Sequence, residues 1–328
     1  MAIGTDASWL GKNWVPASAG TSGFGSGRVL ARPSLGEPVR KFGWPQLAML
    51  APVQGLLILI ILLPSLYVFW LSFTESSYGK QPVFIGLENY VAIWNDRYFW
   101  RALVNTLIVV NVIVYGELLL AFVIASVLVK GVPFRRVILA IVLMPYAISE
   151  VVAVVIWKFL LDPDIGALAK AMAGAGLPDI NWATNPTHGL ALVSLISIWL
   201  NLPFTLIIIY AAMLAVPSDL YESAVIDGAS RWQSFRYVTL PSVMPAVFVA
   251  LIFRYIISFR LFSEVWLLTA GGPARTTEVM AIYLYKQSFT YASFGKGSAT
   301  GWVMVMVSGL IAAAYLHLLY RRGFRQNA

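Results

Sequence analysis

The segment PSDLYESAVIDGASRWQSFRYVTLP, residues 217–241, is polar, although long apolar runs lie on both sides of it, at 189–213 and 245–268. An apolar run of about 20 residues is long enough to cross the hydrocarbon of a bilayer as a helix. The polar segment is therefore predicted to be a loop that leaves the membrane between two spanning helices. Because it also carries charge and turn residues, it has the character of a docking surface for a soluble partner.

The rest of the chain has the composition of a membrane protein. Its 328 residues are 59% hydrophobic and only 12% charged, whereas ordinary soluble domains carry about 25% charged residues. Six apolar runs have spanning length, at about 46–73, 102–129, 134–161, 189–213, 245–268 and 299–320. We therefore expect an all-α polytopic membrane protein with about six transmembrane helices.

The distribution of lysine and arginine predicts the orientation. With both termini inside, thirteen of the 23 basic residues fall on inner segments and seven on outer segments. Cytoplasmic loops carry such an excess of basic residues, so both termini and the 217–241 loop are expected to be cytoplasmic. The net charge of +8 is then explained by topology and contact with anionic membrane lipid, and it gives no support for nucleic-acid binding.

Composition also limits the chemistry of the chain. Cysteine is absent, which excludes disulfides and thiolate metal sites, and the two histidines, His188 and His317, lie too far apart in sequence to suggest a metal cluster. The Gly/Ser-rich start of the chain lacks the pattern of a cleavable signal peptide. We expect a flexible cytoplasmic tail at 1–44, a transmembrane domain at 45–321 and a short cytoplasmic tail at 322–328.

Within the polar loop, residues 219–227 are expected to form a short helix. Pro217 ends the preceding helix, and Ser218 is a typical N-cap residue. Asp219 and Glu222 place negative charge near the positive end of the new helix. The loop is therefore predicted to be structured rather than extended.

Gly228 is expected to end this helix, and Ser230 to cap a second short helix that ends before Pro241. Ala224 and Gly228 are four residues apart and are expected to share a face. Small residues on one face would let another backbone approach closely. An amphipathic helix that only rests on the membrane surface would show a similar pattern.

The spacing in this loop resembles the signature of the membrane subunits of binding-protein-dependent ABC importers. That signature is Glu-Ala-Ala, three residues, Gly, nine residues, Ile, one residue, then Leu-Pro. The corresponding residues here are Glu222, Ser223, Ala224, Gly228, Val238, Leu240 and Pro241. Ser223 and Val238 are mild departures from Ala and Ile. Stretches 143–166, 199–230 and 267–289 further resemble the carbohydrate branch, the maltose and glycerol-phosphate type permeases, and the resemblance extends from about residue 45 to the end.

The resemblance implies an import machine of several subunits in the cytoplasmic membrane of a bacterium or archaeon. The implied partners are a second permease subunit, two ATP-binding cassette subunits and an extracytoplasmic solute-binding protein. The chain lacks a G-x-x-x-x-G-K-[ST] phosphate loop. It is therefore expected to bind no cofactor and to catalyse no reaction, with ATP and Mg²⁺ bound by the ATPase subunits.

The resemblance also implies that the polar loop couples the ATPase to transport. The residues implied in coupling are Glu222, Ser223, Ala224, Asp227, Gly228, Leu240 and Pro241. In this scheme Glu222 and Asp227 pair with basic groups of the ATPase. Movement of the loop then swings the fourth and fifth spans.

Polar and aromatic residues of the fourth and fifth predicted spans are the candidates for the solute pathway. Ionisable groups within a membrane are costly and are functional candidates, and sugars need aromatic faces together with hydrogen-bonding partners. The candidates are Trp199, Asn201, Arg254, Tyr255, Phe259, Arg260 and Glu264. Arg260 and Glu264 are four residues apart, so they are expected to pair. Packing or interhelical pairing is an alternative role for each candidate. Glu117 and Glu150 are expected to be interhelical hydrogen-bonding or gating groups.

Three other classes of protein share some of these features but fit the sequence less well. A secondary transporter would also contain buried charges, but it is expected to show inverted repeats, and no repeat is visible. An intramembrane enzyme would need a nucleophile–base pair or metal ligands, which the residue types disfavour. The permease of a non-carbohydrate ABC importer is the nearer alternative, and the stretch LLTAGGP at 267–273 weighs against it.

Overall fold

The computed structural model describes residues 44–178 and 180–325. The chain divides into two compact units, Met1–Leu57 and Ile58–Ala328. In the first unit the described element is helix α1 (Trp44–Leu57), and the rest of the predicted tail 1–44 lies outside the described residues. At the other end, helix α14 continues to Arg325, so the predicted tail 322–328 begins as helix and its last three residues lie outside the described part.

The second unit is almost entirely helical. Its elements are η1 (Ile58–Leu62), α2 (Leu63–Leu71), β1 (Thr74–Glu75), β2 (Val83–Phe84), α3 (Glu88–Trp94), α4 (Arg97–Val129), α5 (Arg135–Leu143), η2 (Met144–Ala147), α6 (Glu150–Leu160), α7 (Ala167–Gly174), α8 (Pro186–Leu214), α9 (Ser218–Ile226), α10 (Arg231–Ser234), η3 (Phe235–Thr239), α11 (Leu240–Ser258), α12 (Ser263–Leu268), α13 (Met280–Tyr285), η4 (Lys286–Thr290) and α14 (Phe294–Arg325). The short strands β1 and β2 pair antiparallel.

Within the described residues, five helices are long and apolar enough to cross a membrane, and a bent pair makes a sixth if it is counted as one span. The five are Ala48–Leu71, Arg97–Val129, Pro186–Leu214, Arg231–Ser258 and Phe294–Leu318. The expectation of an all-α polytopic membrane protein with about six spans is therefore confirmed.

The apolar run at 134–161 is not one straight helix. It folds as α5 and η2 followed by α6, with a bend of 102° between the two halves. Pro145 lies in the first turn of η2, and Ile148 and Ser149 adopt extended backbone, with ψ of 137° and 139°. Because proline donates no backbone hydrogen bond and extended residues cannot continue a helix, the ladder of hydrogen bonds stops here.

The fifth apolar run also differs from its prediction. The second helix of the polar loop was expected to end before Pro241, but α10, the π-helical turn η3 and α11 form one span from Arg231 to Ser258. Pro241 lies inside this continuous span, directly after the π-helical turn η3, so the helix passes the proline through an irregular turn and does not end there. The run then stops at Ser258, and α12 is a separate short helix.

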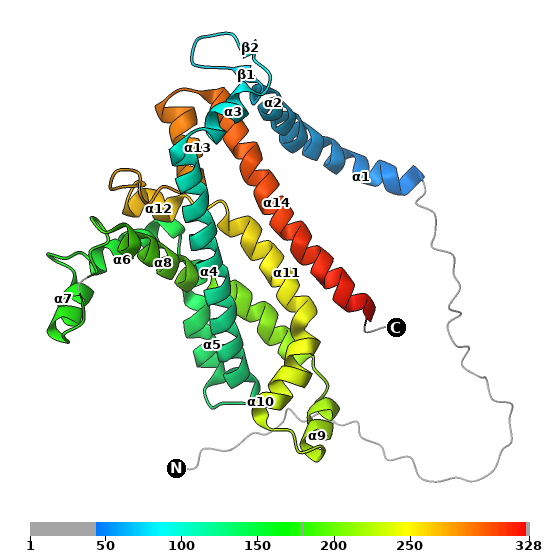
Figure 1. Ribbon diagram of the computed structural model, residues 1–328. Coiled ribbons are helices and arrows are strands. Elements are labelled where there is room, and N and C mark those ends of the chain that lie inside the picture. The colour runs from blue at the N-terminus through cyan, green and yellow to red at the C-terminus, as the bar shows by residue number, and fades with distance from the viewer. Residues whose placement is uncertain (1–43, 179, 326–328) are drawn as a thin grey trace, which may run out of the picture. The chain divides into compact units, whose positions relative to one another are not determined.

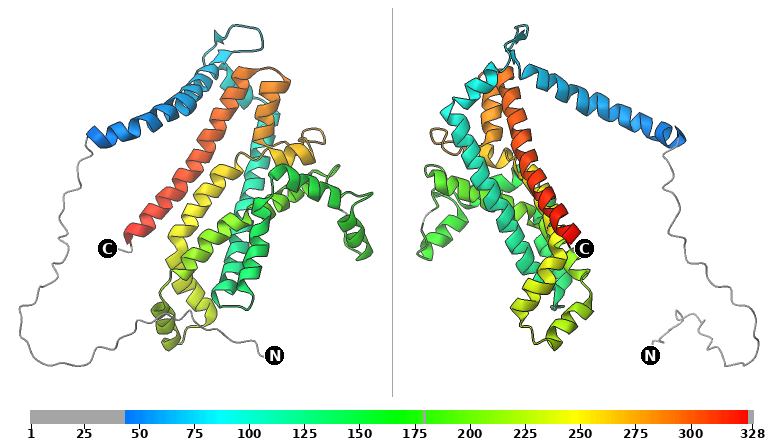
Figure 2. Two further views of the ribbon diagram at one scale, coloured as in Figure 1. Left: turned by 180° about the vertical axis from the view of Figure 1, so that it is seen from behind. Right: turned by 45° about the vertical axis from the view of Figure 1, so that its right-hand side comes forward.

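Helices α4, α8 and α11 form the centre of the second unit, and α14 lies against α11 (Figure 1). Two apolar clusters fill the spaces between them. One includes Ile113 and Ile196 with Val265 of α12, and the other joins Leu206 and Val247 to the second half of α4. Helices α9 and α10 lie at the end of the bundle opposite to α3 and α13, and the views in Figure 2 agree on this placement.

Candidate functional site

The polar loop forms an exposed helix at one end of the bundle. Helix α9 has no buried residue. Its acidic residues Asp219 and Glu222 are exposed, as is Asp227 at its C-cap. The apolar side chains of Val225 and Ile226 are 71% and 85% exposed. Adjacent exposed apolar groups beside carboxylates are typical of a surface that a partner covers.

Gly228 ends α9 with a left-handed backbone, at φ +75°. Its N–H donates to the carbonyl of Val225 at 3.0 Å, and the N–H of Ala229 donates to the carbonyl of Ala224 at 2.9 Å. These two bonds form a Schellman motif, whose left-handed residue is usually glycine. Gly228 therefore lies beyond the helix, and the expectation that it shares a helical face with Ala224 is wrong. No atom lies within 4 Å of the position that a Cβ would occupy.

The two predicted caps differ in outcome. Ser218 is not the N-cap of α9, because the helix already begins at Ser218 and Pro217 occupies the cap position; the Ser218 hydroxyl donates to Asp219 instead. Ser230 does cap α10. Its hydroxyl accepts from the Gln233 N–H at 3.3 Å, while the Ser230 N–H donates to the Gln233 side chain at 2.7 Å, which is a capping box.

The loop is joined directly to the spanning helix that follows. A hydrogen bond of 3.0 Å connects the hydroxyls of Tyr221 in α9 and Thr239 in η3. Leu240 and Pro241, the last residues of the signature, form the start of α11 and are half-buried. Ser223 is exposed and its hydroxyl donates to the carbonyl of Asp219 within α9. The Tyr221–Thr239 hydrogen bond therefore connects α9 to the helix that continues into α11.

Arg254 of α11 and Glu117 of α4 form a buried ion pair. The Arg254 Nε donates to Glu117 Oε2 at 2.6 Å, and Nη2 donates to Oε1 at 2.5 Å. The hydroxyl of Thr205 in α8 donates to the same carboxylate at 3.1 Å. The two charged side chains are 4% and 0% exposed. Glu117, expected to be an interhelical hydrogen-bonding group, thus ties three helices together.

A cavity of about 320 Å³ lies beside this pair, between α6, α8, α11 and α12. Its polar wall consists of Glu150, Ser197, Asn201, Arg254, Ser258, Arg260, Ser263 and Glu264. Carboxylates, guanidinium groups, hydroxyls and an amide therefore meet in one space. The cavity brings together four of the seven predicted pathway residues, namely Asn201, Arg254, Arg260 and Glu264.

The predicted pair of Arg260 and Glu264 is wrong. Helix α11 ends at Ser258, so the four-residue spacing does not place the two side chains on one helical face. Glu264 is buried and accepts a hydrogen bond of 2.8 Å from the Ser197 hydroxyl. Arg260 is exposed, and no hydrogen bond or ion pair joins its side chain to another described residue.

The three aromatic candidates do not line the cavity. Trp199 packs edge-on against Trp157, with ring centroids 5.7 Å apart. Tyr255 is buried and donates to the side-chain oxygen of Asn111 at 2.6 Å. Phe259 is 2% exposed within the apolar cluster of α4, α8 and α11. These three rings therefore support the helices around the cavity.

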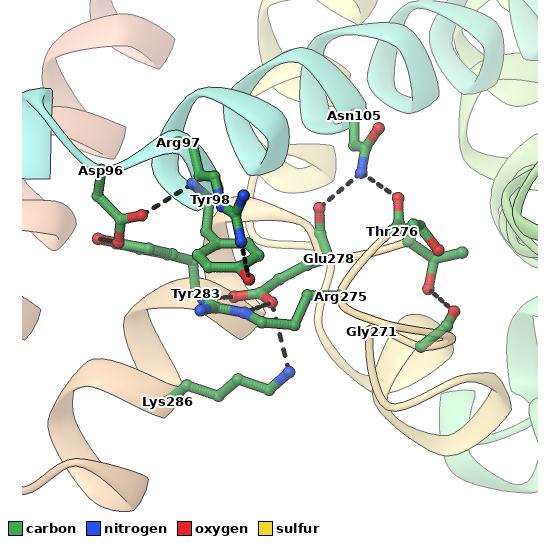
Figure 3. Close-up of polar contacts among 12 residues, drawn as sticks. Asp96, Arg97, Tyr98, Asn105, Gly271, Arg275, Thr276, Glu278, Tyr283 and Lys286 are labelled. Atoms are coloured by element: carbon green, nitrogen blue, oxygen red, sulfur yellow. Dashed lines mark hydrogen bonds and ion pairs between the residues drawn. The ribbon is translucent and has the colours of Figure 1, made fainter.

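A second charged group lies in the connection between α12 and α13, beside the start of α4 (Figure 3). The Arg275 guanidinium donates twice to Glu278, at 2.6 and 2.7 Å, and lies over the Tyr98 ring at 3.8 Å. Lys286 approaches the same carboxylate at 3.4 Å. The hydrogen bonds to Glu278 raise the pKa of the Arg275 guanidinium above its ordinary value. Sequence reasoning missed this group because its members come from α4, a loop and η4.

Residues 117–325 match the family described as the inner membrane component of binding-protein-dependent transport systems. The chain belongs to this family. The matched region begins at Glu117 of the buried pair and contains the polar loop and all the polar residues that line the cavity. The resemblance drawn from residues 217–241 is thus confirmed, and the permease is a transport component rather than an enzyme.

Relatives and solved structures agree with this membership. The permease is 32% identical to the sulfoquinovosyl glycerol transport system permease protein SmoG of Agrobacterium fabrum, over 83% of this chain and 89% of the relative. It is 33% identical to the trehalose transport system permease protein SugA of Mycobacterium tuberculosis, over 80% and 84%. A bacterial ABC transporter that imports the acidic polysaccharide alginate matches with a TM-score of 0.72 and 27% identity, over 85% of the permease and 96% of that chain.

The sequence predicted the residues of the polar loop more completely than the residues that line the cavity of the permease. Ser197 was missed, although it lies four residues before Asn201 and so shares its helical face, a spacing that could have revealed it. Glu150, expected to be an interhelical hydrogen-bonding or gating group, lines the cavity at the start of α6. It reaches this position because of the break near Pro145, which the apolar pattern does not reveal.

Proposed function

We propose that this permease carries a sugar, an oligosaccharide or a sugar derivative into the cytoplasm, driven by ATP hydrolysis on partner subunits. One observation carries the proposal: a single helical span connects the exposed loop to the polar cavity. The span begins at Arg231, next to α9, and ends at Ser258, which lines the cavity. A force applied to the loop is thereby delivered to the solute pathway.

Helix α9 is the proposed contact with an ATP-binding cassette subunit. Its exposed carboxylates, Glu222 and Asp227, suit lysine or arginine on the partner. The side chain of Ile226, which is 85% exposed, would lose its contact with water on docking, which favours association. Closure of an ATPase dimer would push α9 and, through Thr239, the start of α11.

The buried pair of Arg254 and Glu117 would pass this movement to the neighbouring helices. Because an unpaired charge is costly in a low-dielectric interior, α4 and α11 are favoured to move together while the pair is intact. The Thr205 hydroxyl of α8 also donates to Glu117, so α8 is favoured to move with α4 and α11. Rearrangement of these helices would change the shape of the cavity between α6, α8, α11 and α12.

The polar wall of the cavity supports a carbohydrate as the solute. Sugar hydroxyls both donate and accept hydrogen bonds, and the cavity offers acceptors on Glu150 and Glu264 and donors on Asn201 and Arg260. The names of the relatives, which refer to trehalose and sulfoquinovosyl glycerol, support the same class. The solved alginate importer in complex with a pentasaccharide-bound periplasmic protein supports delivery of the solute by a binding protein.

The proposed assembly contains a second permease subunit, two ATP-binding cassette subunits and an extracytoplasmic solute-binding protein. ATP and Mg²⁺ would be bound by the cassette subunits. Both termini and the α9 loop would face the cytoplasm, in agreement with the excess of basic residues on that side.

The proposal is tested by uptake of a radiolabelled sugar into proteoliposomes that contain the whole complex and the sugar-loaded binding protein. We expect uptake only with internal ATP, and insensitivity to a proton ionophore. Glu222→Lys should abolish uptake without loss of the permease from the membrane. Asp164→Lys, which reverses an equally exposed acid in the α6–α7 connection, is the matched control and should transport normally. Uptake without ATP, or normal uptake by Glu222→Lys, would contradict the proposal.

A further inference from the structure

We propose that a groove behind helix α9 binds the headgroup of an anionic phospholipid of the cytoplasmic leaflet. This inference rests on the orientation given in the proposed function, in which α9 faces the cytoplasm. The groove has a volume of about 600 Å³. It is lined by Ser126, Val129, Lys130, Met213, Tyr221, Val225, Ala229, Arg231, Ser234, Phe235 and Thr239.

The charges of the groove favour an anionic occupant. Lys130, at the end of α4, and Arg231, at the start of α10, both line it and are both exposed. Among the described residues neither side chain forms an ion pair or a hydrogen bond, and no carboxylate lines the groove. Two uncompensated cations on one concave surface are suited to a phosphate group.

The remaining wall favours an amphiphile over a soluble anion. Val129, Met213 and Phe235 supply apolar surface from α4, α8 and η3. Val225 adds a side chain that is 71% exposed. A phospholipid would place its phosphate at the two cations and its first methylene groups against these side chains.

The level of the groove along the spanning helices favours a lipid as its occupant. Lys130 directly follows the span Arg97–Val129, and Met213 is the next-to-last residue of the span Pro186–Leu214. The ends of spanning helices lie at the level of the headgroups, where anionic lipids attract basic side chains. Glu222 and Asp227, the proposed contacts of α9 with the ATPase, do not line the groove.

A bound headgroup would act on the connection between the loop and the spanning helix. Tyr221 and Thr239 line the groove and also form the hydrogen bond between α9 and η3. A lipid held between Lys130 and Arg231 would fill the space between α4, α9 and η3. Transport is therefore expected to depend on anionic lipid. A lipid that fills the space behind α9 would keep the helix in contact with η3 when the ATPase pushes on it.

The experiment compares lipid retention by the purified complex in nanodiscs of phosphatidylglycerol and of phosphatidylcholine, measured by native mass spectrometry. We expect the wild type to retain phosphatidylglycerol selectively. Lys130→Gln with Arg231→Gln should weaken this retention about 30-fold, the fold-change corresponding to two basic contacts at a membrane surface. Arg135→Gln with Arg136→Gln is the matched control, because both are exposed basic residues of the neighbouring turn that do not line the groove.

Equal retention of the two lipids, or an equal loss in both double variants, would overturn the proposal. So would a photo-crosslinker at Val225 that reacts with the ATPase subunit and not with phosphatidylglycerol. Because retention is measured without solute, this test is separate from sugar uptake. A complex that retains the lipid but imports no sugar would refute the proposed function alone.

Discussion

Arg254 and Glu117 lie 137 positions apart in the sequence, yet they form a bidentate ion pair that joins α11 to α4. The pair is almost fully buried, and Arg254 also lines the polar cavity. One guanidinium group therefore belongs both to the framework of the bundle and to the wall of the cavity. Its charge is already balanced by Glu117, so it is not available to neutralise an anionic solute without breaking the pair.

Glu117→Ala should lower the stability of the permease substantially. It leaves the Arg254 charge buried without a partner, and breaking a buried pair from one side costs about 3–5 kcal/mol. The double variant Glu117→Leu with Arg254→Met removes both charges and should recover much of this loss while still impairing uptake. Thermal unfolding of the purified complex measures both effects. If Glu117→Ala unfolds at the wild-type temperature, the buried pair does not stabilise the bundle.

Gly228→Asp should uncouple ATP hydrolysis from uptake. The substitution places a charged side chain where the surface of the loop is open and where the backbone has a positive φ. Gly228→Ala adds no clash and should cost about 1–2 kcal/mol of local backbone strain, with partial loss of uptake. ATPase activity and uptake are measured together in proteoliposomes.

Gly131→Asp is the control for this substitution. Gly131 has a similar φ of +76° and the same open surroundings, in the turn between α4 and α5. It lies outside the signature, so uptake should stay normal. Equal loss of uptake in the two aspartate variants would show that added charge at this end of the bundle, rather than the loop itself, is responsible.

Arg260→Ala should change solute affinity without changing stability. Arg260 is the exposed cation of the cavity wall, and its side chain has no partner among the described residues. We expect the half-saturating concentration for uptake to rise about 10- to 100-fold with an unchanged unfolding temperature, since the loss of a hydrogen bond to a charged group corresponds to about 1.5–3 kcal/mol. Arg101→Ala removes an exposed arginine of α4 outside the cavity and should leave both quantities unchanged. A lower unfolding temperature with unchanged uptake would assign Arg260 a structural role.

Arg275→Lys should destabilise the connection between α12 and α13, although it keeps the positive charge. Lysine cannot reproduce the two parallel hydrogen bonds to Glu278 or the planar contact with Tyr98. The loss is expected to be about 1–3 kcal/mol, and limited proteolysis of residues 269–279 should become faster. Arg97→Lys is a control, because Arg97 is exposed and makes one side-chain hydrogen bond, to Tyr98. Equal proteolysis of the two variants would contradict the proposed role of the Arg275 network.

Local features of this permease could be predicted because they depend on residues that are neighbours in the chain. The six apolar runs, the helix over most of 219–227, the break at Gly228 and the cap at Ser230 all arise from interactions within about four residues. The errors also have local causes. The expected helix end before Pro241 did not allow for the π-helical turn η3, through which the helix continues past the proline, and the expected Arg260–Glu264 pair assumed that α11 continued beyond Ser258.

The amino-acid sequence by itself determined the membrane class, the exposed polar loop and the family, because hydropathy, charge and motif spacing are properties of the linear chain. Only the tertiary structure decided which charges are paired. Glu117 meets Arg254, Ser197 meets Glu264 and Glu150 reaches the cavity because helices far apart in sequence pack side by side and the span at 134–161 bends. Those contacts depend on the crossing and bending of helices, which the order of residues along one helix does not specify.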